Sequence, residues 1–232
     1  MTLSLSPDKI RTICEIVNVF ETGKREGDYS AATVLPDGAG ISYGRSQATD
    51  KSDSLDAIVF KYIERRGKYA SEFRGYLDDL SEDATAHVDP GNLPNWVMDL
   101  LGLLIDAGED PIMRTVQDEV FTQNYWVPAV NHCTSMGLTL PLSYAVIYDT
   151  CIHSGPGGVY KIRRLFPDVP PSLGGYEKKW TSAYIRARRA WLGSSSKPVV
   201  RKTVYRMDAF ISLIERGAWE LEPPFTVRNV KF

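Results

Sequence analysis

Apolar residues recur at helical spacing through most of the chain, which predicts a mainly helical protein. In the first such segment, apolar side chains fall every three or four residues from Ile10 to Phe20. Ser6 and Pro7 precede it as a cap and a first helical residue, and Gly23 follows it as a stop. We therefore predict a helix that begins at Pro7 and ends just before Gly23.

A different pattern follows this helix. The runs Ala31–Leu35 and Ile41–Tyr43 are short and rich in β-formers, and the turn sequence Pro36-Asp37-Gly38 lies between them. This arrangement predicts two antiparallel strands joined by a turn.

Helical periodicity then returns for the rest of the chain. The acidic segment Ser81–Asn95, which contains Asp89-Pro90-Gly91, reads as a loop or a link between two lobes and is our expected hinge. Trp96–Ala107 is apolar on several faces and predicts a core helix, and Pro128 should bend or interrupt the long helix that opens at Asp110-Pro111. The predicted helices after the hairpin cover residues 55–63, 69–80, 96–107, 111–125 and 138–152. The fold class is α+β, predominantly α-helical.

Bulk composition narrows the function classes. Of the 232 residues, 43% are hydrophobic and 24% are charged, which is typical of a folded globular protein and excludes a disordered chain. The formal net charge of −2 provides no overall basic field for nucleic acid. No apolar run is long enough to span a membrane, since the longest, Trp96–Ile105, is half the required length.

The cysteines and the start of the chain bear on the redox state of the thiols and on export from the cell. Cys14, Cys133 and Cys151 all lie in apolar segments, so we expect free buried thiols, with one disulfide pair left open. Met1–Lys9 lacks the basic and apolar parts of a secretory signal. We expect a secreted monomer whose signal has been removed or that is exported by another route.

Two carboxylates occupy contrasting settings near the first turn. Glu21 lies in the last turn of the first helix, where the helix dipole and apolar neighbours disfavour its ionised form, so it is a candidate acid. Asp37 lies at a solvated turn, where its charge persists, so it is a candidate base. One acid and one base whose pKa values are separated are what glycosidic bond cleavage requires.

The stretch from Glu21 to Asp37-Gly38-Ala39-Gly40 resembles the active-site segment of the chitosanases of glycoside hydrolase family 46, in which a helix ends at the catalytic glutamate and a short sheet carries Asp-Gly-x-Gly. Four later blocks resemble the family in the same order, so the likeness runs from about residue 6 to residue 225. They are Tyr125-Trp126-Val127-Pro128-Ala129-Val130, Tyr148-Asp149 with Gly155-Pro156-Gly157, Arg206-Met207-Asp208, and Gly217-Ala218-Trp219-Glu220-Leu221-Glu222-Pro223-Pro224.

The resemblance implies a lysozyme-like fold and an activity. Residues 1–232 would form one catalytic domain of two lobes flanking a substrate cleft, with a small antiparallel sheet and a long bent central helix. The activity would be endo-cleavage of β-1,4 bonds of chitosan, a glucosamine polymer, with inversion, Glu21 acting as general acid and Asp37 as general base about 6.5–9.5 Å apart. The partner would be chitosan or a related amino-sugar polymer. The sequence itself contains no metal motif, phosphate loop or Gly-x-Ser-x-Gly nucleophile motif, so we expect no cofactor and no metal.

Further roles are implied for individual residues. Ser42 matches a threonine that positions the attacking water, and Asp53 matches an aspartate that binds the amino sugar, although Asp53 also stands where a helix cap is expected. We expect Tyr43 and Gly44 to line the substrate site. Asp149, Arg188 and Arg206 match an ion network that reaches the catalytic glutamate.

One departure from the family keeps other functions open. Ala39 stands where the family often has an arginine that touches substrate. A lysozyme-like muramidase, endolysin or effector acting on peptidoglycan is therefore the main alternative. A non-catalytic carbohydrate-binding protein is a second one, and the presence of both carboxylates and of Ser42 argues against it.

Overall fold

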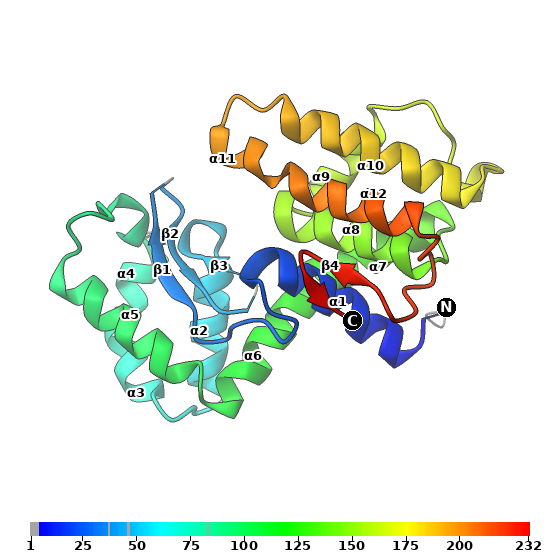
Figure 1. The fold of residues 1–232 in the computed structure, drawn as a ribbon. Coiled ribbons are helices and arrows are strands. Elements are labelled where there is room, and N and C mark those ends of the chain that lie inside the picture. Colours follow the sequence, from blue (N-terminus) through cyan, green and yellow to red (C-terminus); the bar gives the residue numbers. More distant parts are fainter. Residues whose placement is uncertain (1–4, 37, 46, 83) are drawn as a thin grey trace. The chain divides into compact units, whose positions relative to one another are not determined.

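The computed structural model describes residues 5–36, 38–45, 47–82 and 84–232. Its chain divides into two compact units: unit 1 is Met1–Arg25 with Asn124–Phe232, and unit 2 is Glu26–Gln123. Both units are mainly helical, and unit 2 carries a small antiparallel sheet (Figure 1).

Unit 1 is built around one buried helix, α8 (Pro141–Ser154). Every residue of α8 from Pro141 to Cys151 is buried, because α1, α7, α9 and α10 all pack against it (Figure 1). The predicted helix over residues 138–152 is thereby confirmed. The bounds of the other elements of unit 1 are α1 (Pro7–Thr22), α7 (Val127–Met136), α9 (Gly157–Arg163), α10 (Glu177–Gly193), α11 (Pro198–Arg201), α12 (Tyr205–Glu215), β4 (Thr226–Val227) and β5 (Val230–Lys231).

Helix α1 forms as its sequence predicts. The Ser6 hydroxyl accepts a hydrogen bond from the backbone N–H of Lys9 at 3.3 Å, and Pro7 is the first helical residue. Gly23 ends the helix in the left-handed region at φ 78°, which a glycine adopts without steric cost. These two end signals place Glu21 one residue before the last residue of α1.

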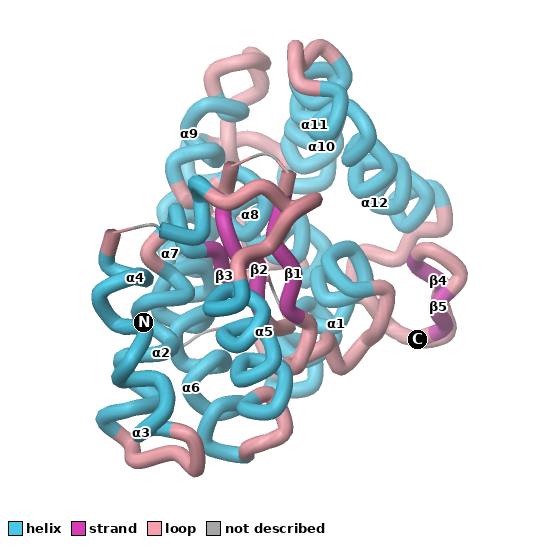
Figure 2. The backbone as a smooth tube through the Cα atoms, turned by 90° about the vertical axis from the view of Figure 1, so that its left-hand side faces the viewer, coloured by secondary structure: helices cyan, strands magenta, loops and turns pink. Residues whose placement is uncertain are grey.

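The sheet of unit 2 has the strand order β1 (Ala32–Leu35), β2 (Gly40–Tyr43) and β3 (Ala48–Thr49), as Figure 2 shows. The predicted hairpin is present, with Leu35 opposite Gly40. Strand β3 is an addition, since its two residues are too few to form a pattern in the sequence. The helices of unit 2 are α2 (Ser54–Glu64), α3 (Ala70–Phe73), α4 (Leu77–Ser81), α5 (Asn95–Ala107) and α6 (Pro111–Phe121).

Three expectations for unit 2 were wrong. Instead of one helix over residues 69–80, α3 and α4 are separated by a 3-10 turn at Arg74–Tyr76, which contains the helix-weakening Gly75. Helix α5 buries one face only, since Met98 and Ile105 are 49% and 44% exposed. The segment Ser81–Asn95 does not link the units but lies inside unit 2.

The chain passes from unit 2 to unit 1 through an irregular helical turn. Asp110 caps α6 by accepting a hydrogen bond from the backbone N–H of Ile112 at 2.9 Å. After Phe121, residues Thr122–Trp126 form a π-helical turn, and Pro128 follows as the second residue of α7. The predicted interruption of the helix is thereby confirmed. Its physical reason is that a proline has no N–H to donate to the helical hydrogen-bond ladder.

None of the three cysteines is joined in a disulfide in the described part of the chain. Cys133 and Cys151 are buried in unit 1, and Cys14 is partly buried there. The expectation of free thiols is confirmed. No helix of the described residues is long and apolar enough to cross a membrane.

Candidate active site

The candidate acid is held in a network of buried charges within unit 1. Arg206, on α12, donates one hydrogen bond to Glu21 Oε1 and another to Asp149 Oδ1, both at 2.7 Å. Arg188, on α10, donates to the second oxygen of Asp149 at 2.5 Å. The side chains of Asp149 and Arg188 have no exposed surface, and those of Arg206 and Glu21 are 4% and 14% exposed. Of these four groups, Glu21 alone reaches solvent appreciably.

The network balances charge around a single acid. Asp149 is deeply buried, which by itself raises its pKa, but Arg188 and Arg206 outweigh burial and hold the pKa below its usual value. The pKa of Glu21 is raised instead, because desolvation outweighs the stabilising charge of Arg206, and the negative charge of Asp149 adds to the rise. The arrangement therefore separates an ionised, structural carboxylate from one that retains its proton to a higher pH.

Two further groups border this network. Tyr205 donates a hydrogen bond from its hydroxyl to the carbonyl of Phe20 at 2.9 Å, which ties the end of α1 to α12. Burial and the charges of Arg206 and Arg188 lower the pKa of His153 to about 4, so its ring is neutral at neutral pH. The sequence assigned neither group a role, because a bond to a backbone carbonyl and a neighbouring charge leave no pattern in the chain.

The unit 2 residues expected at the site have different surroundings. Asp37 lies outside the described residues. The fully buried hydroxyl of Ser42 donates a hydrogen bond to Gln47 Oε1 at 2.7 Å. Gly44 has φ 74° and lies so close to Gln117 that an added Cβ would come within 2.1 Å of the amide oxygen. The constraint on Gly44 is thus one of packing.

The expectation that Tyr43 lines the substrate site needs correction. Its side chain has no exposed surface and belongs to the core of unit 2, and burial raises the pKa of its hydroxyl. All four residues of β2 are buried, so neither face of this strand is exposed to solvent.

Asp53 is available to bind a ligand. It occupies the cap position of α2 at φ 55°, but its side chain makes no capping hydrogen bond. The residue is exposed, and no partner of its carboxylate is found within the described part of the chain. Two roles were left open for Asp53, helix capping and binding of the amino sugar. Its side chain does not cap the helix.

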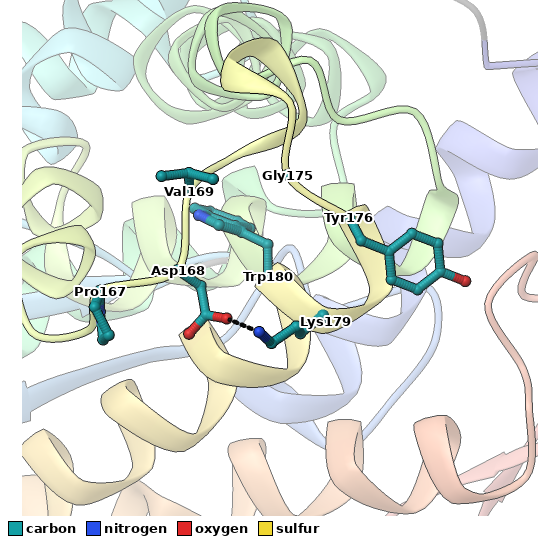
Figure 3. Close-up of a pocket in the computed structure, with 7 residues that line it drawn as sticks. All are labelled: Pro167, Asp168, Val169, Gly175, Tyr176, Lys179 and Trp180. Carbon is teal, nitrogen blue, oxygen red and sulfur yellow. Dashed lines mark ion pairs between the residues drawn. The ribbon is translucent and has the colours of Figure 1, made fainter.

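One hollow of unit 1 lies apart from these residues. It has a volume of ≈ 400 Å³, and its one carboxylate, Asp168, pairs with Lys179 at 3.1 Å (Figure 3). The residues lining it are Pro167, Asp168, Val169, Gly175, Tyr176, Lys179 and Trp180. None of the expected catalytic or network residues is among them, so this hollow offers no acid and base pair. In the described residues, no group of three or more His, Cys, Asp or Glu side chains is arranged to bind a metal.

Comparison with known proteins decides the family. The model of glycosyl hydrolase family 46 matches residues 15–225, which include Glu21, Asp149 and Arg206. The chain belongs to glycosyl hydrolase family 46. It is therefore a glycoside hydrolase by descent, and the resemblance noted from the sequence is confirmed.

Individual relatives agree with this assignment to family 46. A chitosanase of Bacillus subtilis (strain 168) is 26% identical over 244 residues, covering 98% of this chain and 84% of its own. A mutant chitosanase from Bacillus subtilis MY002, solved in complex with 6 GlcN, superposes with a TM-score of 0.85 at 25% identity, over 97% of this chain and 95% of that chain. A family 46 chitosanase from Gynuella sunshinyii, solved with chitotetraose, matches with a TM-score of 0.84 at 22% identity, over 98% of both chains. The mainly helical α+β fold is thus that of family 46 chitosanases.

Proposed function

We propose that this family 46 protein cleaves β-1,4 bonds of chitosan by an inverting mechanism, with Glu21 as general acid and Asp37 as general base. The observation that carries the proposal is the state of Glu21, a carboxylic acid whose pKa is raised although it is hydrogen-bonded to Arg206. A group that keeps its proton to a higher pH is suited to protonate a leaving oxygen.

The chemistry balances with one water molecule. The bond between the anomeric carbon and the glycosidic oxygen breaks, and the oxygen takes the bonding electrons together with the proton of Glu21. Water attacks the anomeric carbon from the opposite face and loses its proton to Asp37, which inverts the centre. Arg206 then stabilises the Glu21 carboxylate that the step creates, through the 2.7 Å contact.

Recognition of a polycation requires carboxylates that are free to contact ammonium groups. Asp53 suits this role because it is exposed and its side chain does not cap α2. We propose Ser42 as the group that orients the attacking water; because its side chain is as buried as that of Tyr43 and donates its proton to Gln47, this role requires the water to reach its hydroxyl oxygen. Glu21 belongs to unit 1 and the other groups to unit 2, so the mechanism requires one sugar chain to reach residues of both units.

Export from the cell would bring the enzyme to such a polymer. Chitosanase activity in the culture medium is the test for export.

The test is product analysis of glucosamine hexamer hydrolysis, with the anomer recorded during the reaction. We expect the α-anomer first from the β-linked chain, and a drop of about two to four orders of magnitude in kcat for Glu21→Gln and for Asp37→Asn. Matched controls are Glu215→Gln and Asp78→Asn, which neutralise exposed carboxylates elsewhere in units 1 and 2. Near-normal turnover of either catalytic variant, or cleavage of peptidoglycan in preference to chitosan, would overturn the proposal.

A further inference from the structure

A second buried carboxylate, in unit 2, has no role in the mechanism above. Asp50 has no exposed surface and accepts hydrogen bonds from both the backbone N–H of Thr85, at 3.1 Å, and the hydroxyl of Thr85. A buried carboxylate is costly unless hydrogen bonds satisfy it, so a chain that keeps one gains something from its orientation. Asp50 begins the 3-10 turn Asp50–Ser52, and Thr85 belongs to the 3-10 turn Ala84–His87.

The Thr85 hydroxyl connects Asp50 to strand β2 of the sheet. Its oxygen accepts a hydrogen bond from the backbone N–H of Ile41 at 3.0 Å while its proton is directed to Asp50. Because a hydroxyl has one proton, the carboxylate fixes the direction of donation and leaves a lone pair for Ile41. Strand β3 pairs only with Ser42 and Tyr43, so Thr85 supplies an acceptor just beyond the end of β3.

The backbone before Ile41 is held by the same two segments. Gly40 has φ 75°, and an added Cβ would lie 2.4 Å from the Thr85 hydroxyl oxygen and 2.9 Å from the Asp50 Cβ. The carbonyl of Ala39 accepts a hydrogen bond from the backbone N–H of Lys51 at 3.3 Å. Three consecutive residues, Ala39, Gly40 and Ile41, are therefore fixed by contacts from outside the hairpin.

These three residues directly follow Gly38 in the segment that carries Asp37. We propose that Asp50 and Thr85 are positioning residues for the general base Asp37 and that they act through the Ala39–Ile41 backbone, which they fix. The inference rests on the proposed function of Asp37. Catalytic groups must be held to within about 0.5 Å, and a misplacement of about 1 Å can cost about 100-fold in rate.

The test is a double-mutant cycle between Thr85→Val and Asp37→Asn, with kcat measured on glucosamine hexamer. Valine keeps the shape of threonine but removes both hydroxyl bonds, so we expect kcat to fall by about 10-fold to 100-fold, with a smaller change in KM and a displaced acidic limb of the pH profile. Thr85→Ser keeps the hydroxyl and should restore most of the activity. Thr181→Val, which removes a buried hydroxyl bonded to Ser143 in unit 1, is the control for general destabilisation.

The cycle separates the two proposals. If Thr85 acts through the base, Thr85→Val has little further effect once Asp37→Asn has removed the base. An equal fold loss in both backgrounds, or wild-type kcat for Thr85→Val, overturns the positioning role while leaving the catalytic role of Asp37 intact. Near-normal activity of Asp37→Asn alone overturns the proposed function instead. Asp50→Asn keeps the side-chain volume and is carried through the same cycle, so the result does not depend on whether Thr85→Val folds.

Discussion

At the scale of single residues, the proton affinity of Glu21 is set by opposing influences that mutation can separate. Desolvation and the negative charge of Asp149 raise its pKa, whereas Arg206 lowers it. In the proposed mechanism Glu21 must carry its proton, so its pKa sets the pH above which activity declines. Each neighbour of Glu21 therefore has a predictable effect on the alkaline limb of the pH profile.

We predict shifts of opposite sign for the two neighbours. Arg206→Gln removes the positive charge beside Glu21, so its pKa rises and the alkaline limb of kcat/KM moves to higher pH. Asp149→Asn removes a negative charge, so the pKa of Glu21 falls and the limb moves to lower pH. The measurement is the pH dependence of kcat/KM on glucosamine hexamer for each variant. If the alkaline limb moved in the same direction in Arg206→Gln and in Asp149→Asn, the assignment of Glu21 as the acid would be contradicted.

The same network predicts a dependence of stability on acid. The pKa of Asp149 is lower in the folded protein than in the unfolded chain, so its ion pairs stabilise the fold fully above the unfolded value of about 3.9. This stabilisation is lost as the pH falls through the lower, folded pKa. We expect the melting temperature of the wild-type protein to fall steeply below about pH 4. Asp149→Asn should be less stable than the wild type at about pH 7, and its melting temperature should fall less as the pH is lowered. Thermal unfolding monitored by circular dichroism at several pH values checks both expectations.

Asp53 gives a prediction about binding alone. Since its exposed carboxylate makes no capping bond, Asp53→Asn should leave the melting temperature unchanged. Loss of one contact to an ammonium group should raise KM for glucosamine oligomers by up to about 10-fold, or about 1.4 kcal/mol, with little change in kcat. Asp78→Asn, at another exposed carboxylate of unit 2, is the control and should change neither value. An unchanged KM in Asp53→Asn would exclude Asp53 from substrate binding.

At the scale of elements, the parts that could be predicted are those whose signals are local. Ser6, Pro7 and Gly23 define α1, and Asp110 with Pro111 opens α6, because capping uses residues a few positions apart. The breaks and the exposed faces of α3 to α5 could not be read, since burial depends on what packs against a helix. The Asp50–Thr85 contact joins residues 35 positions apart and was equally invisible.

The end of α1 offers a test of how an element positions the acid. Gly23 has φ 78° with open space around its Cα, so Gly23→Ala introduces backbone strain without a steric clash, at a cost of roughly 1–2 kcal/mol. Strain there should loosen the last turn of α1, which carries Glu21, and lower both stability and kcat. Gly102→Ala, inside α5 and also in open space, should instead stabilise the protein by about 0.5–1 kcal/mol. Chemical denaturation and hexamer kinetics on both variants make the comparison.

At the scale of the whole molecule, the small net charge hides a strong division. Unit 2 holds 19 acidic and 8 basic residues, a formal charge of −11, whereas unit 1 holds 10 acidic and 19 basic residues, a formal charge of +9. The total of −2, which provides no overall basic field for nucleic acid, does not reveal this division. We therefore expect a polycation such as chitosan to be attracted to unit 2 and repelled by unit 1.

This charge division predicts which mutations alter KM for chitosan. Asp106→Lys, at an exposed position of unit 2, should raise KM for chitosan several-fold at low salt, while Lys202→Glu in unit 1 should leave KM unchanged or lower it. Both effects should disappear as added salt shortens the screening length from about 10 Å at 0.1 M to about 3 Å at 1 M. Steady-state kinetics over a range of salt concentrations provide the measurement, with kcat as the internal control, because neither residue belongs to the site. If the two variants respond alike, substrate affinity is set by contacts such as that proposed for Asp53 and not by the charge of unit 2.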